Sequence, residues 1–329
     1  MHPSQSPAPG MAVISVLLIV ALIAGLATAL MTRQNTVLHS VQNEQYRLRN
    51  YWLLRGEINH VQARLRHISH RQPVVRLGGD WSSSGQSRPI TLDNGIPARL
   101  YTLITDEQSK YNLTNLVERG QIQPKEVSAF LRLCALLGVP PAQAELISQR
   151  VISSLIDDQA PDTAPPHKQT GTHSVVSSPS HPVQAKAPHH RAPRLRVLHD
   201  LTAVPGVQAA TLARLQPYVT VLPERTWINA NTASPVVIAA WVPGLSLEQA
   251  KALLKSRDQG TWFINHGDII QRLNMPQLPS HEVLLGITSS WFHVQALVQS
   301  AQGISQIQAL IHHDIRQQRT QLMWLREGV

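Results

Sequence analysis

The sequence predicts an α+β protein in which one long amino-terminal helix precedes a largely helical middle and a closing antiparallel sheet. Three observations predict this class. Residues 11–72 contain no proline and follow a helical pattern. The segments 124–137 and 140–156 each carry proline near the start, and glycine lies between them, as is typical of two consecutive helices. Residues 290–327 contain short alternations of apolar and polar side chains, which predict three antiparallel strands.

Composition excludes several classes of protein. With 329 residues, of which 43% are hydrophobic, the chain can bury two or three cores and is neither a collagen nor a fully disordered tail. Its single cysteine, Cys134, excludes an internal disulfide framework and a cysteine zinc finger, and its apolar neighbours indicate a small buried side chain. The net charge of +9 permits a nucleic-acid partner, but only 15% of the residues are charged, so the balance does not indicate one.

The amino terminus carries a predicted membrane span. Residues 1–32 contain no Lys, Arg, Asp or Glu, and within Met11–Met31 only Ser15 and Thr28 are polar. A helix of that length extends about 31 Å, enough to cross a hydrocarbon core of about 30 Å. Three interpretations compete: a cleaved signal peptide, a plain signal anchor, and a prepilin-type leader that is cut after Gly10.

The alternatives differ in what they explain. A signal peptide would have a basic first region and an apolar run of about 7–15 residues, and this segment has neither, although Ala27-Thr28-Ala29 offers a cleavage site. A signal anchor leaves Gly10 unexplained. In a prepilin-type protein the apolar run follows the cut and is retained as an assembly helix, with Met11 as the new amino terminus.

The helical pattern continues beyond the span. Apolar residues recur mostly at intervals of three, four or seven, at Val37, Val41, Leu48, Tyr51, Ile58, Val61, Leu65 and Ile68. One rod of about 90 Å is therefore expected, with Gly56 as a weak point. Arginines follow the span and none precedes it, so the positive-inside rule alone predicts a cytoplasmic carboxy-terminal part.

The middle of the chain divides into strand, helix and a segment of different composition. Residues 99–104 have strand character. Residues 159–194 contain seven prolines and five of the sixteen histidines with almost no large apolar residue, which predicts a disordered linker. These histidines lack the spacing of metal ligands.

Two Pro-Gly turns form a helix-hairpin-helix pattern, with Pro205-Gly206 in the first and Pro243-Gly244 in the second. DNA-binding hairpins carry a second glycine two residues later, so that backbone N–H groups approach a phosphate. Here Gln208 and Ser246 occupy that place. The pattern therefore predicts a packing module without nucleic acid, and the alternative is a membrane-tethered DNA-binding protein.

The sequence predicts no enzyme, no catalytic residue, no cofactor and no metal site. None of the common nucleophile, metalloprotease, P-loop or dinucleotide-binding motifs occurs. The pair Asp157-Asp158 reads as a helix end in solvent. His312 and His313 are neighbours on a predicted strand, so their side chains point to opposite faces and do not converge.

Several segments together resemble the K-type minor pseudopilin of the type II secretion system, the general secretion pathway protein K family. They are the Gly10-Met11 junction with its apolar helix, ITDEQSKYNLTNLV (104–117), HDLTAVPGVQAATLARLQPYVTVLP (199–223), WINANTASPVVIAAWVPGLSLEQAKALL (227–254) and MWLREG (323–328). The most specific piece is INANTASP followed by PGLS. The likeness covers nearly the whole chain except 159–194.

The resemblance implies a pseudopilin fold, in which the long transmembrane helix packs on an antiparallel sheet interrupted by a large helical, helix-hairpin-helix or SAM-like domain. The expected parts are a leader (1–10), the membrane part of the helix (11–31), its periplasmic part (32–72), the first part of the sheet (73–117), the inserted domain (118–280, with 159–194 inside it) and the closing strands (281–329).

The resemblance also implies a function. The subunit would lie at the tip of a short inner-membrane pseudopilus, pair with I- and J-type minor pseudopilins and help to export folded proteins. Prepilin peptidase would cleave after Gly10 and methylate Met11, the span would contact membrane lipid, and the carboxy-terminal domain would lie in the periplasm.

One residue departs from what is common among pilins, and the leader and one segment depart from what is common in this family, whose leaders usually carry Arg or Lys before the cut, whereas residues 1–10 carry none. At the fifth mature position pilins carry glutamate and this chain has Ser15, which fits a capping subunit because a carboxylate in the membrane needs a partner. The family's calcium-binding acidic stretch is replaced by 159–194, so calcium is not expected.

Overall fold

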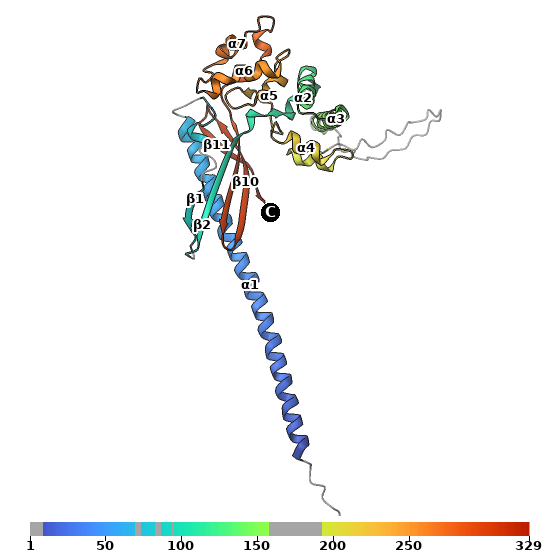
Figure 1. Ribbon diagram of the computed structural model, residues 1–329, viewed down its shortest axis with the longest axis vertical. Coiled ribbons are helices and arrows are strands. Elements are labelled where there is room, and N and C mark those ends of the chain that lie inside the picture. Colours follow the sequence, from blue (N-terminus) through green and yellow to red (C-terminus); the bar gives the residue numbers. More distant parts are fainter. Residues whose placement is uncertain (1–8, 70–73, 83–86, 94, 158–192, 329) are drawn as a thin grey trace, which may run out of the picture.

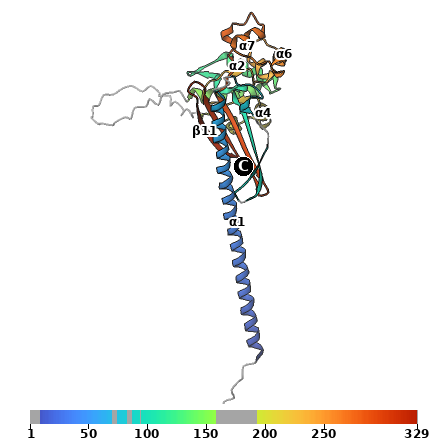
Figure 2. The same ribbon diagram turned by 90° about the vertical axis from the view of Figure 1, so that its left-hand side faces the viewer.

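The first helix dominates the shape of the molecule. The computed structural model describes residues 9–69, 74–82, 87–93, 95–157 and 193–328. Helix α1 (Pro9–Ser69) has 61 residues, runs without a break through Gly56 and extends about 92 Å. It begins inside the predicted leader. Its first half projects alone from the rest of the protein, and its second half lies along a sheet (Figures 1 and 2).

The main sheet has five antiparallel strands in the order β1-β2-β9-β10-β11. They are β1 (Arg88–Thr91), β2 (Pro97–Asp106), β9 (Trp291–Ser300), β10 (Gly303–Asp314) and β11 (Arg319–Gly328). The three strands predicted within 290–327 are confirmed. The last two strands are displaced in register between Leu310 and Ile311, where a β-bulge lies in the pairing.

One face of the sheet is covered by α1. Leu54, Ile58, Val61 and Leu65 recur at helical spacing, are at most 4% exposed and share a core with the inward residues of β2, β9 and β10. Each such side chain stabilises the fold by roughly 1.5–3 kcal/mol when fully buried. Polar contacts fix the helix along its length: Asn50 Nδ2 donates to Ser305 Oγ at 2.9 Å, and Thr102 Oγ1 donates to a Glu57 carboxylate oxygen at 2.8 Å.

A helical part lies between β2 and β9 in the sequence and at one end of the sheet in space (Figure 1). Its helices are α2 (Pro124–Leu136), α3 (Pro141–Asp157), α4 (Ala209–Leu215), α5 (Pro235–Trp241), α6 (Leu247–Asp258) and α7 (His266–Leu273). The predicted helices at 124–137 and 140–156 are thus confirmed within one residue at each end. Cys134 is buried, as predicted, and burial raises the pKa of its thiol to about 12.

Short elements complete the helical part. Its two-residue strands pair as β3 (Tyr111–Asn112) with β6 (Val219–Thr220), β4 (Val117–Glu118) with β5 (Gln121–Ile122), and β7 (Ile228–Asn229) with β8 (Leu285–Gly286). Its single 3-10 turns are η2 (Glu107–Ser109), η3 (Leu113–Leu116), η4 (Leu198–Ala203) and η5 (Ser280–Glu282). A further turn, η1 (Asp80–Ser82), lies between α1 and β1, and its Trp81 belongs to the core of the sheet.

The chain leaves and rejoins the sheet at places that differ from the predicted limits of 117 and 281. It leaves at Asp106. The apolar residues that follow, Tyr111, Leu113 and Leu116, are buried in the core of the helical part and not against the sheet. It rejoins at Trp291, because β8 pairs with β7 inside the helical part. Of the predicted linker 159–194, all but the last two residues lie outside the described residues.

Candidate functional site

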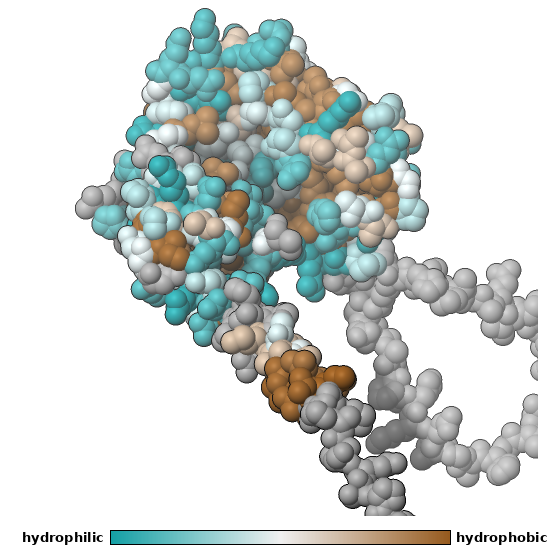
Figure 3. All heavy atoms as spheres, turned by 60° about the horizontal axis from the view of Figure 1, so that its bottom comes forward, coloured by the Kyte–Doolittle hydropathy of each residue, from teal (hydrophilic) through white to brown (hydrophobic). Residues whose placement is uncertain are grey.

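The exposed half of α1 is the first candidate site. The Gly10-Met11 junction lies in the first turn of α1, which begins at Pro9. Within the described residues, Val13–Met31 is a segment long and apolar enough to cross a membrane, and none of it is buried against the rest of the protein. It projects as a band of hydrophobic atoms (Figure 3). Ser15 lies on this exposed surface.

The first Pro-Gly turn is held by a side chain of a neighbouring helix. Gly206 has a φ of +88°, so the turn needs the left-handed conformation that glycine adopts without strain. Gln143, at the start of α3, binds this turn twice: its Nε2 donates to the carbonyl of Gly206 at 2.8 Å, and its Oε1 accepts from the N–H of Gln208 at 2.9 Å. The N–H at the place of the second glycine is therefore occupied.

The second Pro-Gly turn is closed by its own helix. Gly244 has a φ of +79°. Ser246 is the N-cap of α6, and its hydroxyl accepts from the N–H of Gln249 at 3.2 Å while the Gln249 side chain accepts from the N–H of Ser246 at 2.8 Å. This reciprocal arrangement is a capping box. It uses the backbone donors that would face a phosphate in a DNA-binding hairpin.

Two of the basic residues near the turns are also engaged. Arg214 Nη1 donates to the carbonyl of Gly138 at 2.9 Å, and Lys251 forms an ion pair of 2.7 Å with Glu248. Both observations favour the interpretation that the two hairpins are packing modules, and neither favours the DNA-binding alternative.

A buried polar cluster joins the sheet to the helical part. Asp106, the last residue of β2, is 2% exposed. One of its carboxylate oxygens accepts from Thr232 Oγ1 at 2.6 Å, Ser289 Oγ at 2.6 Å and Asn229 Nδ2 at 3.0 Å, and the other accepts from the N–H of Gln108 at 2.8 Å. Asn229 Nδ2 also donates to the carbonyl of Val75, just beyond α1, at 2.9 Å. We call these residues the Asp106 cluster.

The Asp106 cluster is polar but isolated from solvent. Burial raises the pKa of Asp106 above its ordinary value, although the hydrogen bonds from Ser289 and Thr232 act in the opposite direction. All of the side chains that reach the carboxylate are neutral donors. This geometry suits a structural joint between segments that are distant in the sequence.

Other asparagines of the segments 104–117 and 227–254 bind backbone groups. Asn112 accepts from the N–H groups of Thr114 and Leu222, both at 3.1 Å. Asn115 forms a pair of hydrogen bonds with the backbone of Thr226, at 2.9 and 3.0 Å. Asn231 does the same with Phe263, at 2.9 Å in both directions. Each of these side chains therefore holds a loop of the helical part by its backbone groups.

These polar residues were not predicted as functional residues, although the motifs that contain them were recognised. ITDEQSKYNLTNLV supplies Asp106, Asn112 and Asn115, and INANTASP supplies Asn229, Asn231 and Thr232. A signal was present for three of them: Asn112, Asn115 and Asn229 each lie beside a large apolar residue, where a buried amide must be hydrogen-bonded. Sequence spacing alone does not show which backbone groups they reach.

A second buried acid lies inside the helical part. Glu126 of α2 is 6% exposed; Tyr111 Oη lies 3.3 Å from its carboxylate, and Arg225 Nη2 also lies at 3.3 Å. Arg225 contacts Glu118 as well. Burial raises the pKa of Glu126 to about 7, and the positive charge of Arg225 partly opposes this rise.

Of the remaining candidates, His312 and His313 lie within the described residues. His312 packs on Trp291 with ring centroids 4.5 Å apart, whereas its neighbour His313 is buried at 3% exposure, so the two rings do not converge, as predicted. Among the described residues there is no group of three or more His, Cys, Asp and Glu that could hold a metal ion. Asp158 and the five histidines of the predicted linker lie outside the described residues.

Comparison with known proteins identifies the family. The family profiles described as type II secretion system protein K match residues 109–224 and 228–288. The chain is 31% identical to type II secretion system protein K of Pseudomonas aeruginosa, covering 87% of this chain and 83% of that protein. The protein of the same name from Klebsiella pneumoniae is 28% identical, with coverage of 77% and 76%.

A solved structure has the same fold. The GspK-GspI-GspJ complex from the type 2 secretion system of enterotoxigenic Escherichia coli contains a chain that aligns with a TM-score of 0.61 at 20% identity, covering 88% of this chain and 99% of that one. The long apolar helix, the antiparallel sheet with helices and the sequence matches all indicate the same family. The chain belongs to the type II secretion system protein K family, whose members are minor pseudopilins that take part in protein transport.

Proposed function

We propose that this protein caps the pseudopilus of a type II secretion system as a non-enzymatic subunit. It assembles with I- and J-type minor pseudopilins, starts the filament and supports the export of folded proteins across the outer membrane. The observation that carries this proposal is the geometry of α1, whose apolar half is fully exposed while its other half is fixed to a sheet. Such a helix is anchored in a bilayer at one end and presents a rigid domain at the other.

The proposal places the anchor in the inner membrane and the domain in the periplasm. Prepilin peptidase cuts after Gly10 and the new amino group lies on Met11. Family membership supports this orientation against the arginines that follow the span. Those arginines precede a long folded domain, and the positive-inside rule is weak for long translocated domains.

Ser15 supports a position above the other subunits. A glutamate at this depth in a membrane needs a cationic partner, and an unpaired carboxylate there costs several kcal/mol. A capping subunit has no subunit above it to supply that partner. The neutral hydroxyl of Ser15 avoids this cost.

The surface for the partner helices lies on α1 beyond the span. Val41, Leu48 and Trp52 are 49, 51 and 67% exposed and follow one another at intervals of seven and four residues, so they form one stripe opposite the face packed on the sheet. Exposed apolar side chains in a row mark an interaction surface. The solved complex of a GspK chain with GspI and GspJ supports helices of those subunit types as the partners.

The test is the assembly of the full-length chain in its host. Trp52→Glu puts a charge into the stripe, and we expect at least about a tenfold loss of co-purification with the I- and J-type subunits from detergent extracts, with a matching loss of secretion. His60→Glu is the matched control, because His60 is exposed on the same helix but outside the stripe. Normal assembly and secretion of Trp52→Glu would contradict the proposed surface.

A further inference from the structure

A groove lies where the helical part meets the sheet, on the face opposite α1. Its cavity measures about 430 Å³, within the range of pockets that hold ligands. Leu198, Thr202 and Leu212, from the first hairpin, line one wall, and His293, Gln308 and Trp324 of the sheet line the floor. We call this cavity the hairpin–sheet groove.

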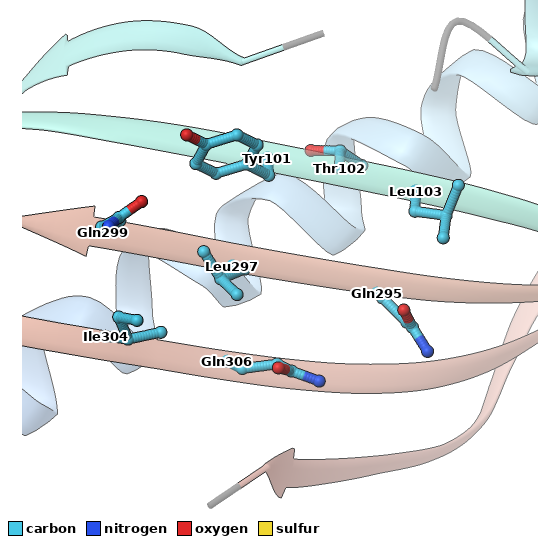
Figure 4. Close-up of a pocket in the computed structure, with 8 residues that line it drawn as sticks. All are labelled: Tyr101, Thr102, Leu103, Gln295, Leu297, Gln299, Ile304 and Gln306. Atoms are coloured by element: carbon cyan, nitrogen blue, oxygen red, sulfur yellow. The ribbon is translucent and has the colours of Figure 1, made fainter. Parts of the chain in front are cut away.

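The floor of the groove continues along the face of the sheet opposite α1, which no helix among the described residues covers beyond the groove, and we call it the uncovered face. Strand register places Leu310 beside His293 and Trp324, and the next row holds Gln295, Gln308 and Arg326. Beyond them lies a second hollow of about 360 Å³, lined by Tyr101, Thr102, Leu103, Gln295, Leu297, Gln299, Ile304 and Gln306. These side chains stand on the strands with α1 passing behind (Figure 4).

The surface combines exposed apolar side chains with neutral amides. Ile304, the second residue of β10, and Leu103, within β2, are 64 and 44% exposed. Glutamines alternate with them, and none of the residues that line the second hollow is charged. A glutamine side chain both donates and accepts hydrogen bonds, as a peptide group does. This chemistry suits an extended polypeptide segment.

One positive charge at the groove is uncompensated. Lys110 is paired with Glu107 at 2.7 Å, and both side chains are largely buried. Burial lowers the pKa of His293, which favours its neutral ring. Arg326 is exposed, its Cζ lies 4.9 Å from the centroid of the Trp324 ring, and no carboxylate among the described residues pairs with it. The groove is therefore complementary to a single carboxylate beside apolar side chains.

We propose that the uncovered face of the sheet and the hairpin–sheet groove bind an extended segment of a partner protein. The segment is mostly uncharged, alternates apolar and polar side chains, and places one acidic side chain on Arg326. Its apolar side chains lie on Leu297 and Ile304, and its backbone meets the glutamines. This surface is separate from the α1 stripe, so a subunit held in a filament by α1 can still use it.

The proposal is tested with the full-length chain in lipid nanodiscs. The probes are fluorescent nine-residue peptides in which Leu or Val alternates with Thr or Gln, with one Asp at a varied position, and the same peptides with Asn in its place. Fluorescence anisotropy should show that at least one Asp peptide binds about tenfold more tightly than its Asn partner, as a charge-assisted hydrogen bond predicts.

Variants assign the binding to the surface. Arg326→Gln should make each Asp peptide bind as weakly as its Asn partner, and Ile304→Glu should weaken both about tenfold or more. Two matched control variants, Arg319→Gln and Ile122→Glu, should bind like the original chain. Arg319 is an exposed arginine on the same strand, and Ile122 is an isoleucine of the helical part that is 49% exposed.

Several results would overturn the proposal. They are the absence of binding by every Asp peptide, equal binding of Asp and Asn peptides in the original chain, or losses in the controls that match those in the variants. Sedimentation of the full-length chain in detergent gives one more: if Ile304→Glu dissociates a dimer, the face is an interface between two copies of this chain.

Discussion

Single polar residues hold the two halves of this protein together. Asp106 ends β2 and receives four hydrogen bonds from residues spread between Gln108 and Ser289. Asn229 extends the same cluster to Val75. Because water is excluded there, the hydroxyls of Thr232 and Ser289 and the N–H of Gln108 would lose their acceptor if the carboxylate were absent, whereas Asn229 would keep the carbonyl of Val75. The position of the helical part on the sheet therefore depends on a few named side chains as well as on apolar packing.

Asp106→Ala removes the shared acceptor and leaves several buried donors without a hydrogen-bond partner. We expect the free energy of unfolding to fall by about 3–5 kcal/mol, because each unsatisfied buried donor costs about 1–3 kcal/mol. Ser289→Ala removes one donor to the carboxylate and one acceptor of Asn229 Nδ2, which keeps Asp106 and Val75 as acceptors, so it should cost less, about 1 kcal/mol. Urea unfolding of the full-length chain in detergent, followed by tryptophan fluorescence, measures both. Equal, small losses for the two variants would show that the cluster does not hold the joint.

Glu126 predicts a pH dependence of stability. Its pKa is about 7 in the folded chain against an ordinary value of 4.5, so the folded state keeps a proton that the unfolded state loses as the pH rises between these values. Stability from this group is therefore highest below about pH 4.5 and declines until about pH 7. Glu118, Arg225 and Tyr111 are the charged or titratable groups that contact this network.

The Glu126→Gln variant tests the direction of this pH dependence. Between pH 4.5 and pH 7 the original chain should lose roughly 2–3 kcal/mol relative to the variant, since one pKa unit corresponds to about 1.4 kcal/mol. Urea midpoints across this pH range give the comparison. A difference between the two proteins that stays constant with pH, or that grows in the opposite direction, would contradict the assignment.

At the scale of elements, strongly periodic segments were predictable and polar contacts were not. The unbroken pattern of 11–72 and the alternation of 290–327 each correspond to an observed helix or to strands. The limits of the sheet were less predictable. The segment around Tyr111 and Leu113 is too short to show a period, so its sequence does not distinguish the end of a strand from a buried turn. Gln143, which occupies the first hairpin turn, lies more than sixty residues away from it in the sequence.

The second hairpin depends on its cap. Ser246→Ala removes the hydroxyl that accepts from Gln249, and we expect a loss of about 1 kcal/mol in the free energy of unfolding. Ser246→Asp keeps an acceptor at the amino-terminal end of α6 and should restore stability. Urea unfolding distinguishes them. If the alanine and aspartate variants are equally destabilised, the cap is not what stabilises this turn.

At the scale of the whole molecule, two surfaces are separated by the sheet. The apolar half of α1 and the stripe of Val41, Leu48 and Trp52 lie on the helix, whereas the hairpin–sheet groove lies on the opposite face. The sequence predicted the span and the helix because apolar residues there are continuous or periodic. It did not predict the groove, because its lining comes from the first hairpin, β9, β10 and β11, which meet only in the folded chain.

The fate of the amino terminus tests the account most directly. The protein purified from its native host is analysed by intact mass, which reads the first residue and its modification together. We predict a chain that begins at Met11, carries one methyl group on its amino nitrogen and retains the whole of Val13–Met31. A soluble product that begins at Leu30 would contradict the account, because the helix that anchors and assembles the subunit would be gone.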